Sequence, residues 1–215
     1  MVVVALALAM LALFVVNIFV GSTHVPPSQV LEVLGACLGC PGGNVSETTS
    51  FIILHSRLPQ AVVAVFCGAS LSVAGLMLQT AFRNPLAGPS VFGITSGASL
   101  AVAIVTLAVG TSTAIGGQIT VVAAAFVGAT AVTALILALS AIVRSGVMLL
   151  IVGIMIGYLS SSAITLLNYF ASADGMRSYM LWGMGDFGAV SSEQLPVFVA
   201  LSALALLSAV LLVKP

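Results

Sequence analysis

The chain has 215 residues, of which 61% are hydrophobic and only 5% are charged, and its five basic and five acidic side chains cancel at neutral pH. A water-soluble domain carries about a quarter charged residues, so this composition excludes a soluble globular protein and predicts one that lies in a bilayer. We expect membrane lipid around the chain and no nucleic-acid partner.

The apolar runs are long enough to cross a membrane, because a hydrocarbon core about 30 Å thick requires about 20 apolar residues per helix. Backbone groups in lipid must pair within a helix or a closed barrel, and these runs lack the alternating pattern of barrel strands. The predicted fold class is therefore all-α, a polytopic membrane helical bundle. Six spans are predicted, at Val2–Val20, Pro59–Phe82, Val91–Val109, Gln118–Val143, Val147–Phe170 and Leu195–Val213. A cleaved signal peptide is the alternative for the first span, but that span has no basic start and is longer than the usual apolar region of such peptides.

Two segments between spans are predicted to carry structure. Ser28 to Leu38 could form a short amphipathic helix at the membrane surface, and residues 171–194 contain aromatic side chains typical of a membrane interface. Cys37 and Cys40 form a C-x-x-C pair that could become a disulfide, or two unremarkable loop cysteines. A zinc site would need two further ligands, and we expect neither a metal nor another cofactor.

The few charges predict the orientation of the chain. Arg83, Arg144 and Lys214 lie in segments without an acidic residue, whereas all five acids fall in the alternate segments. Because lysine and arginine are enriched on the cytoplasmic side, we expect the N-terminus, the loop at 83–90 and the C-terminus to face the cytoplasm.

Small residues are common inside the predicted spans, where they let helix backbones approach closely in lipid. We expect helix packing at Gly68 and Gly75, at the G-x-x-x-G pair Gly93 and Gly97, and at the second such pair Gly153 and Gly157. No Asp, Glu, Lys, Arg or His lies well inside any predicted span, although proton relays and ion-coupled carriers usually require such residues there. The chain also lacks a P-loop and a metalloprotease motif, so we expect no enzyme, and energy for any transport must come from a partner.

The stretch "RNPLAGPSVFGITSG", residues 83–97, contains two prolines that restrict the residues before them. We expect Asn84 and Gly88 to leave the helical conformation, so that the chain turns sharply. Ser90 and Thr95 are then candidates to satisfy exposed backbone donors at the start of the next helix.

Residues 57–102, "RLPQAVVAVFCGASLSVAGLMLQTAFRNPLAGPSVFGITSGASLAV", closely resemble the signature of the FecCD-type permeases. "MLLIVGIMIGYLSSS" and "SYMLWGMGDFGAVSSEQLP" are similar to two later segments of that family. The resemblance implies a bacterial inner-membrane subunit of an ABC importer for iron-siderophores, haem or cobalamin. It also implies a homodimer with a central pathway, two cytoplasmic ATP-binding subunits and a periplasmic substrate-binding protein.

By the same resemblance, Asn84 and Pro85 in one turn and Ser145 and Gly146 in another line a cytoplasmic gate, and Arg57 docks the binding protein. Gln60 replaces the family's second arginine, which weakens the docking assignment. Two structural alternatives stay open, since Arg57 could end a helix and Asn84 could cap a turn.

Family members continue beyond the sixth span into a segment that contacts the ATPase and then into four more spans. The resemblance therefore implies that residues 1–215 are the N-terminal part of one permease domain, unable to transport alone. Two rivals are a structural or assembly membrane protein, which needs only the packing glycines, and a secondary transporter, which would predict coupling-ion residues at mid-membrane.

Overall fold

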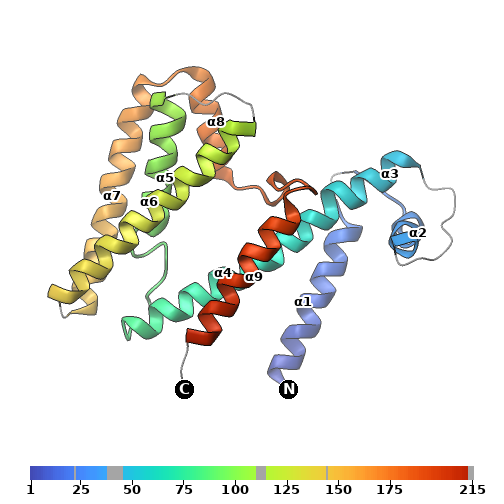
Figure 1. Ribbon diagram of the computed structural model, residues 1–215, viewed down its shortest axis with the longest axis horizontal. Helices are drawn as coiled ribbons and strands as arrows, with labels where there is room; N and C mark the ends of the chain where they lie inside the picture. The colour runs from blue at the N-terminus through green and yellow to red at the C-terminus, as the bar shows by residue number, and fades with distance from the viewer. Residues whose placement is uncertain (22, 38–45, 110–114, 144, 213–215) are drawn as a thin grey trace. The chain divides into compact units, whose positions relative to one another are not determined.

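A computed structural model describes residues 1–21, 23–37, 46–109, 115–143 and 145–212 (Figure 1). These residues form helices and turns and no strands, which confirms the predicted all-α class. The long helices are α1 (Val2–Phe19), α4 (Leu58–Ala81), α6 (Ile115–Ile142), α7 (Gly146–Phe170) and α9 (Leu195–Leu212). Shorter elements are α2 (Pro27–Cys37), α3 (Glu47–Ile52), α5 (Ile94–Ala103), α8 (Ala173–Met184), the π-helices η1 (Ile53–Arg57) and η2 (Ile104–Val109), and the 3-10 helix η3 (Phe187–Ala189).

Five helical segments of the described chain are long and apolar enough to cross a membrane. They are Val2–Phe19, Glu47–Ala81, Ile119–Ile142, Gly146–Phe170 and Leu195–Leu212. The predicted third span is a shorter apolar helix, Ile94–Ala108, which starts three residues later than the predicted Val91. Residues 88–93 are used in turns instead, and the reason lies in the backbone of those turns, described below. The helical membrane bundle is thus confirmed, with its third element shorter than expected.

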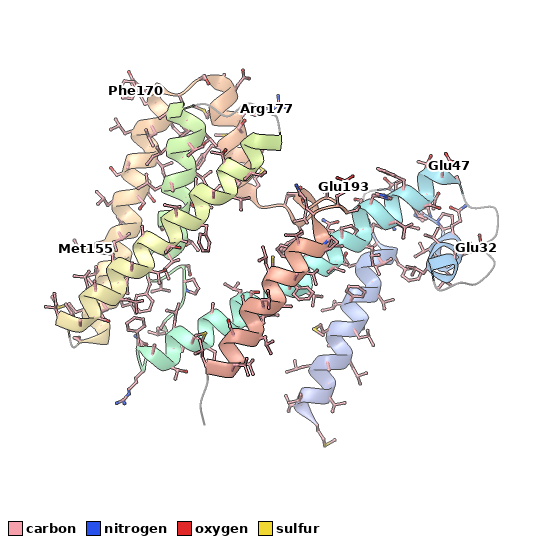
Figure 2. All side chains as sticks on the ribbon, in the orientation of Figure 1. Glu32, Glu47, Met155, Phe170, Arg177 and Glu193 are labelled. Carbon is pink, nitrogen blue, oxygen red and sulfur yellow. The ribbon has the colours of Figure 1, made fainter. Side chains whose placement is uncertain are left out.

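The outside of the long helices is apolar, as a bilayer protein requires. Met155 and Phe170 on α7, labelled in Figure 2, are 64% and 76% exposed. Exposing such an apolar surface to water is unfavourable, whereas the hydrocarbon tails of lipids surround it without that cost in free energy.

The chain divides into two compact units, and the boundary falls within α4. The first unit consists of residues 1–71 and 186–215. Its core gathers side chains from the end of α1, from the segment before α2, from α2, from η1 and from the start of α4, namely Ile18, Val25, Val30, Val33, Ile53 and Ala61. The predicted amphipathic helix is therefore present as α2, with valines inward and Glu32 exposed.

The second unit, residues 72–185, is built around α5, which packs against both α6 and α7 (Figure 1). The predicted outer segment after Phe170 forms α8, capped at its start by Ser172, whose Oγ accepts a hydrogen bond from the Gly175 N–H at 3.2 Å. A methyl group at Gly175 would lie 2.9 Å from the Thr106 carbonyl oxygen, so α8 sits directly on η2. The rings of Tyr179 and Trp182 stack with centroids 6.2 Å apart.

Candidate functional site

The candidate site consists of two turns, and the first, at residues 82–87, begins where α4 ends. The Arg83 N–H donates to the Thr80 carbonyl at 3.3 Å, and the Asn84 N–H donates to the Gln79 carbonyl at 3.0 Å. This pair of bonds is the Schellman arrangement, which places the residue after the helix in the left-handed conformation. Arg83 occupies that place with φ 47°. Glycine is the usual residue there, so an arginine pays a backbone cost of about 1–2 kcal/mol.

Asn84 and Pro85 hold the chain in the turn. The Asn84 Oδ1 accepts the Leu86 N–H at 2.9 Å, and the Asn84 carbonyl accepts the Ala87 N–H at 3.0 Å. Asn84 is half-buried, whereas Pro85 is exposed. The structure thus places Asn84 as the cap of its own turn, one of the two alternatives that the sequence left open. A part in gating is compatible with this geometry and stays a prediction.

Another hydrogen-bonded turn follows at residues 88–93. Both Val91 and Phe92 donate to the Gly88 carbonyl at 3.1 Å. Gly93, with φ 74°, then ends this turn and directly precedes α5. The closing bonds run from the Gly93 N–H to the Ser90 carbonyl at 3.2 Å and from the Ile94 N–H to the Pro89 carbonyl at 3.0 Å.

The expectation that the hydroxyls of Ser90 and Thr95 would cap α5 is wrong, because the N-cap is Gly93 and makes no side-chain bond. The carbonyls of Ser90 and Pro89 instead accept the N–H groups of Gly93 and Ile94, in the left-handed geometry that a glycine allows.

The second turn of the site lies at the start of α7. Ser145 caps that helix, since its Oγ accepts the Met148 N–H at 3.4 Å and its carbonyl accepts the Leu149 N–H at 3.1 Å. A methyl group at Gly146 would lie 3.4 Å from the Phe82 carbonyl oxygen. The turn at 82–87 and the turn at 145–146 are therefore neighbours, although about sixty residues separate them in the chain.

A shared apolar cluster holds the two turns together. The rings of Phe82 and Phe92 lie with centroids 4.5 Å apart, and Phe92 is fully buried. The cluster has Ala87, Phe92, Ile136 and Leu149 at its centre, with Leu78, Phe82, Val143 and Val152 among the partly buried side chains around it. Four segments meet here, so the relative position of the two turns is set by packing rather than by the loops themselves.

The glycines of the first G-x-x-x-G pair contact two different helices. A methyl group at Gly93 would lie 2.7 Å from the Gly153 carbonyl oxygen on α7, and one at Gly97 would lie 2.8 Å from the Gly128 carbonyl oxygen on α6. Both distances are too short for a real side chain. Close packing by Gly93, Gly97 and Gly153 is thereby seen in the structure, and Gly128 joins them as a contact that the spacing did not single out.

The remaining predicted packing glycines are less crowded. A methyl group at Gly157 would lie at an ordinary 3.5 Å from the Ser96 Oγ, with no other atom of the described residues within 4 Å. One built at Gly68 or at Gly75 would meet no atom within 4 Å in the described part of the chain. Packing at these two positions stays a prediction.

Arg57 lies in the other unit, away from solvent. Its side chain is 4% exposed, and its Nη1 donates to the carbonyls of Ile18 and Phe19 at 2.9 and 3.0 Å. Its Nη2 donates to the carbonyl of Thr23. Arg57 thus bonds to the carbonyls where α1 ends, while it lies itself within the continuous helical stretch Glu47–Ala81 rather than at the end of a helix. A docking role stays a prediction that would require the guanidinium to give up these bonds.

The possible disulfide between Cys37 and Cys40 cannot be followed in the structure, because residue 40 lies outside the described residues, as does Arg144. Cys67 is a half-buried free thiol on α4. Among the residues that are placed, no three of His, Cys, Asp or Glu lie close enough together to hold a metal ion.

Comparison with known proteins connects this architecture to a family of transporters. The model of the FecCD transport family matches residues 8–215. The vitamin B12 import system permease protein BtuC of Serratia proteamaculans is 34% identical over 160 residues, which make up 72% of this chain and 46% of that protein. The hemin transport system permease protein HmuU of Yersinia pestis is 35% identical over 138 residues, 64% of this chain and 41% of that protein.

A solved structure of a metal-chelate type ABC transporter in an inward-facing conformation matches with a TM-score of 0.71 at 24% identity, and it shows the same fold. The match covers 94% of this chain and 59% of the solved one. The chain spans about half the length of the curated relatives it matches. Because the family model covers nearly all of the sequence, the chain belongs to the FecCD transport family.

Proposed function

We propose that this chain is part of the permease subunit of an ABC importer in a bacterial inner membrane, and that the permease takes up a metal chelate of the cobalamin, haem or iron-siderophore class. Membership of the FecCD family supports the proposal, as do the vitamin B12 and hemin transport names of its relatives. The five helical segments of the described residues that are long and apolar enough to cross a membrane also support it.

The intact permease is proposed to work as a homodimer, with a pathway between the two subunits. Separate cytoplasmic ATP-binding subunits would supply the energy, and a periplasmic binding protein would deliver the substrate. Residues 1–215 would be the N-terminal part of the permease domain. We further propose that the N-terminus and the paired turns face the cytoplasm, because Arg83 is exposed on the first turn and no acid accompanies it there.

The observation that carries the mechanism is the contact between the two turns. Asn84 and Ser145 come from distant parts of the sequence, yet Gly146 and the Phe82 carbonyl place their turns side by side. Both polar side chains bond to the backbone of their own turn, so each turn is a preformed unit. We propose that alternating access opens and closes the pathway by moving these two turns together as one cytoplasmic gate, while their internal hydrogen bonds stay intact.

A cross-linking experiment on the intact permease tests the gate. In a background without Cys37, Cys40 and Cys67, Asn84→Cys is introduced and the protein is reconstituted with its ATPase. If the gate lies on the dimer axis, an oxidant should link the two copies of residue 84, and ATP together with the binding protein should change the yield. Phe126→Cys is the matched control, because Phe126 is exposed on α6 and belongs to neither turn.

Equal cross-linking at positions 84 and 126, unaffected by ATP, would contradict the proposed gate. Uptake into proteoliposomes then tests the substrate class, with cobalamin, haem and a ferric siderophore offered separately. The proposal expects ATP-dependent accumulation of one of the three. Absence of ATP-dependent uptake, together with purification of the intact protein without an ATPase, would favour the structural or assembly alternative.

A further inference from the structure

The two turns of the candidate site belong to a long stretch of sequence that is almost without charge. Residues 58–173 contain two charged side chains, and both are arginines. Arg83 lies in the first turn, and Arg144 directly precedes the N-cap of α7 in the sequence. The two segments meet where a methyl group at Gly146 would lie 3.4 Å from the Phe82 carbonyl oxygen. The charges of this stretch are therefore both positive, and both belong to the segments that form the proposed gate.

The guanidinium of Arg83 is available to a partner. The residue is exposed, and its side chain makes no hydrogen bond or ion pair with any residue that the structure describes. Arg57 is the opposite case, since its guanidinium bonds to three carbonyls. The first turn itself supplies no counter-charge, because Pro85 and Leu86 are apolar and Asn84 bonds to the backbone of its own turn.

The backbone indicates that an arginine stands at position 83 against a local preference. With φ 47° the residue occupies the left-handed place that glycine usually takes after a helix. Strain of this kind concentrates at functional sites. A positive charge that served only to orient the chain across the membrane could stand at another exposed position of the same loop, such as Ser90, without that strain. The place of Arg83 thus points to a need for a guanidinium directly beside Asn84.

A guanidinium in this setting recognises anionic groups. Its planar fork of N–H donors matches carboxylates, and bonds between charged partners are stronger than those between neutral ones. The apolar surroundings of a membrane pathway also screen the charge less than water does. Among the chelates of the proposed substrate class, haem carries carboxylates and ferric tricatecholates carry negative charge on the metal complex. Cobalamin and ferrioxamine carry no net negative charge.

We propose that Arg83 and Arg144 form a cationic site at the cytoplasmic gate, which binds the negatively charged groups of the transported chelate, so that the substrate is an anionic chelate. This inference rests on the proposed function, because the site lies on the transport pathway only if the two turns form the gate. The shared chemistry is the negative charge of the chelate, and its two sources are the carboxylates of haem and the catecholates of a ferric siderophore.

Uptake by the intact permease, reconstituted with its ATPase and its binding protein, tests the substrate class. Haem and a ferric tricatecholate are the anionic probes, and cobalamin and ferrioxamine are the probes without net negative charge. We expect ATP-dependent uptake of one anionic probe, and the probe that is taken up identifies the source of the negative charge. Uptake of cobalamin or ferrioxamine as fast as that of the anionic probes would overturn the inference and leave the proposed function intact.

Arg83→Gly separates the cationic site from selection by the binding protein. Glycine suits the left-handed turn, so this variant should fold. We expect uptake of the anionic chelate to fall at least about tenfold, as for the loss of a hydrogen bond between charged groups. Arg83→Lys keeps the charge and the backbone strain and should retain more uptake than Arg83→Gly. Arg177→Ala is the matched control, because Arg177 is also exposed but lies on α8, and it should leave uptake unchanged.

Two results with Arg83→Gly would overturn the inference. One is uptake of the anionic chelate at the rate of the unmodified permease. The other is loss of the ATPase from the purified complex, which would show that Arg83 contacts that subunit instead of the chelate.

Binding to the intact permease in nanodiscs decides the inference even where no probe is taken up. Haem and its dimethyl ester differ only in their carboxylates, which the ester neutralises. The cationic site predicts that haem, or the ferric tricatecholate, binds the unmodified permease at least about tenfold more tightly than Arg83→Gly. The haem ester and ferrioxamine should bind the two permeases equally. If every probe binds both equally, the inference is wrong. If no probe is taken up and no ATPase co-purifies, the proposed function fails, and these affinities still show whether the turn binds anions.

Discussion

Replacing Gly93 with alanine tests the contact that joins the turn at residues 88–93 to α7. The position has φ 74°, a left-handed conformation that costs an L-residue about 1–2 kcal/mol. The new methyl group would also lie 2.7 Å from the Gly153 carbonyl oxygen and 3.1 Å from the Ile156 Cγ2, and overpacking of this kind costs about 1–3 kcal/mol. The two effects have separate causes, so we expect Gly93→Ala to lower the free energy of unfolding by about 2–5 kcal/mol.

Two other glycines separate these causes. Gly153→Ala adds a methyl group 2.6 Å from the Phe92 Cα, on the opposite side of the same contact, without the unusual φ. Crowding should lower the free energy of unfolding of this variant by about 1–3 kcal/mol, and the better helix propensity of alanine should raise it by about 0.5–1 kcal/mol. Gly75→Ala meets no atom of the described residues within 4 Å and should be neutral or stabilising by about 0.5–1 kcal/mol.

The measurement is an equilibrium unfolding titration with sodium dodecyl sulfate in mixed micelles, followed by the fluorescence of Trp182, the single tryptophan. We expect the Gly75→Ala variant to be the most stable of the three, Gly153→Ala to be intermediate and Gly93→Ala to be the least stable. Equal stability of the Gly93 and Gly75 variants would show that the α5 to α7 contact is not tight and would refute the reasoning. A loss at Gly75 alone would instead place that face of α4 against something outside the described chain.

Four further predictions use the same titration. Arg83→Gly should stabilise by about 1 kcal/mol, since glycine relieves the left-handed strain after α4, and a loss would mean that the arginine side chain compensates for it. Ser145→Ala should destabilise by about 0.5–2 kcal/mol through loss of the α7 cap, and Ser145→Asp should restore it. Asn84→Ala should cost about 1 kcal/mol by leaving the Leu86 N–H without its acceptor, whereas Asn84→Asp should keep the turn. Burial raises the pKa of Tyr179, so the neutral phenol stabilises the fold fully below about pH 10, and this contribution is lost as the pH rises through the raised pKa. Tyr179→Phe should remove that loss of stability, and the absorbance of the tyrosinate should follow the titration.

The helical scaffold could be predicted from composition because lipid leaves the backbone few alternatives. Apolar runs without charge had to become helices, and the amphipathic pattern before Cys37 predicted α2 within one residue at each end. The start of α5 was predicted three residues early for a local reason. Hydrophobicity continues through Val91 and Phe92, but the backbone bonds to the Gly88 carbonyl and the left-handed Gly93 hold those residues in a turn.

Packing partners were harder to predict than packing residues. A G-x-x-x-G spacing marks two small residues on one helix face, yet Gly93 contacts α7 and Gly97 contacts α6. Which neighbour a glycine meets depends on the crossing of three helices, and that geometry is not encoded in the spacing. Arg57 presents the same difficulty, since a basic residue at the end of a span fits both a docking contact and a helix end. Its burial and its hydrogen bonds to the carbonyls where α1 ends cannot be seen from the local sequence around Arg57, and the docking contact stays a prediction.

The polar side chains of the two turns bond to backbone, which bears on how a gate made from them would move. Asn84 and Ser145 each satisfy a donor in their own segment, and the apolar cluster around Phe92 joins the segments. A displacement that kept these bonds would avoid losing their net contribution of about 0.5–1.5 kcal/mol per hydrogen bond. A displacement within either turn would incur that cost. The low-energy motion of the proposed gate is therefore a joint tilt of the ends of α4 and α7, and the cluster that binds them is what a substitution would have to loosen to uncouple the two turns.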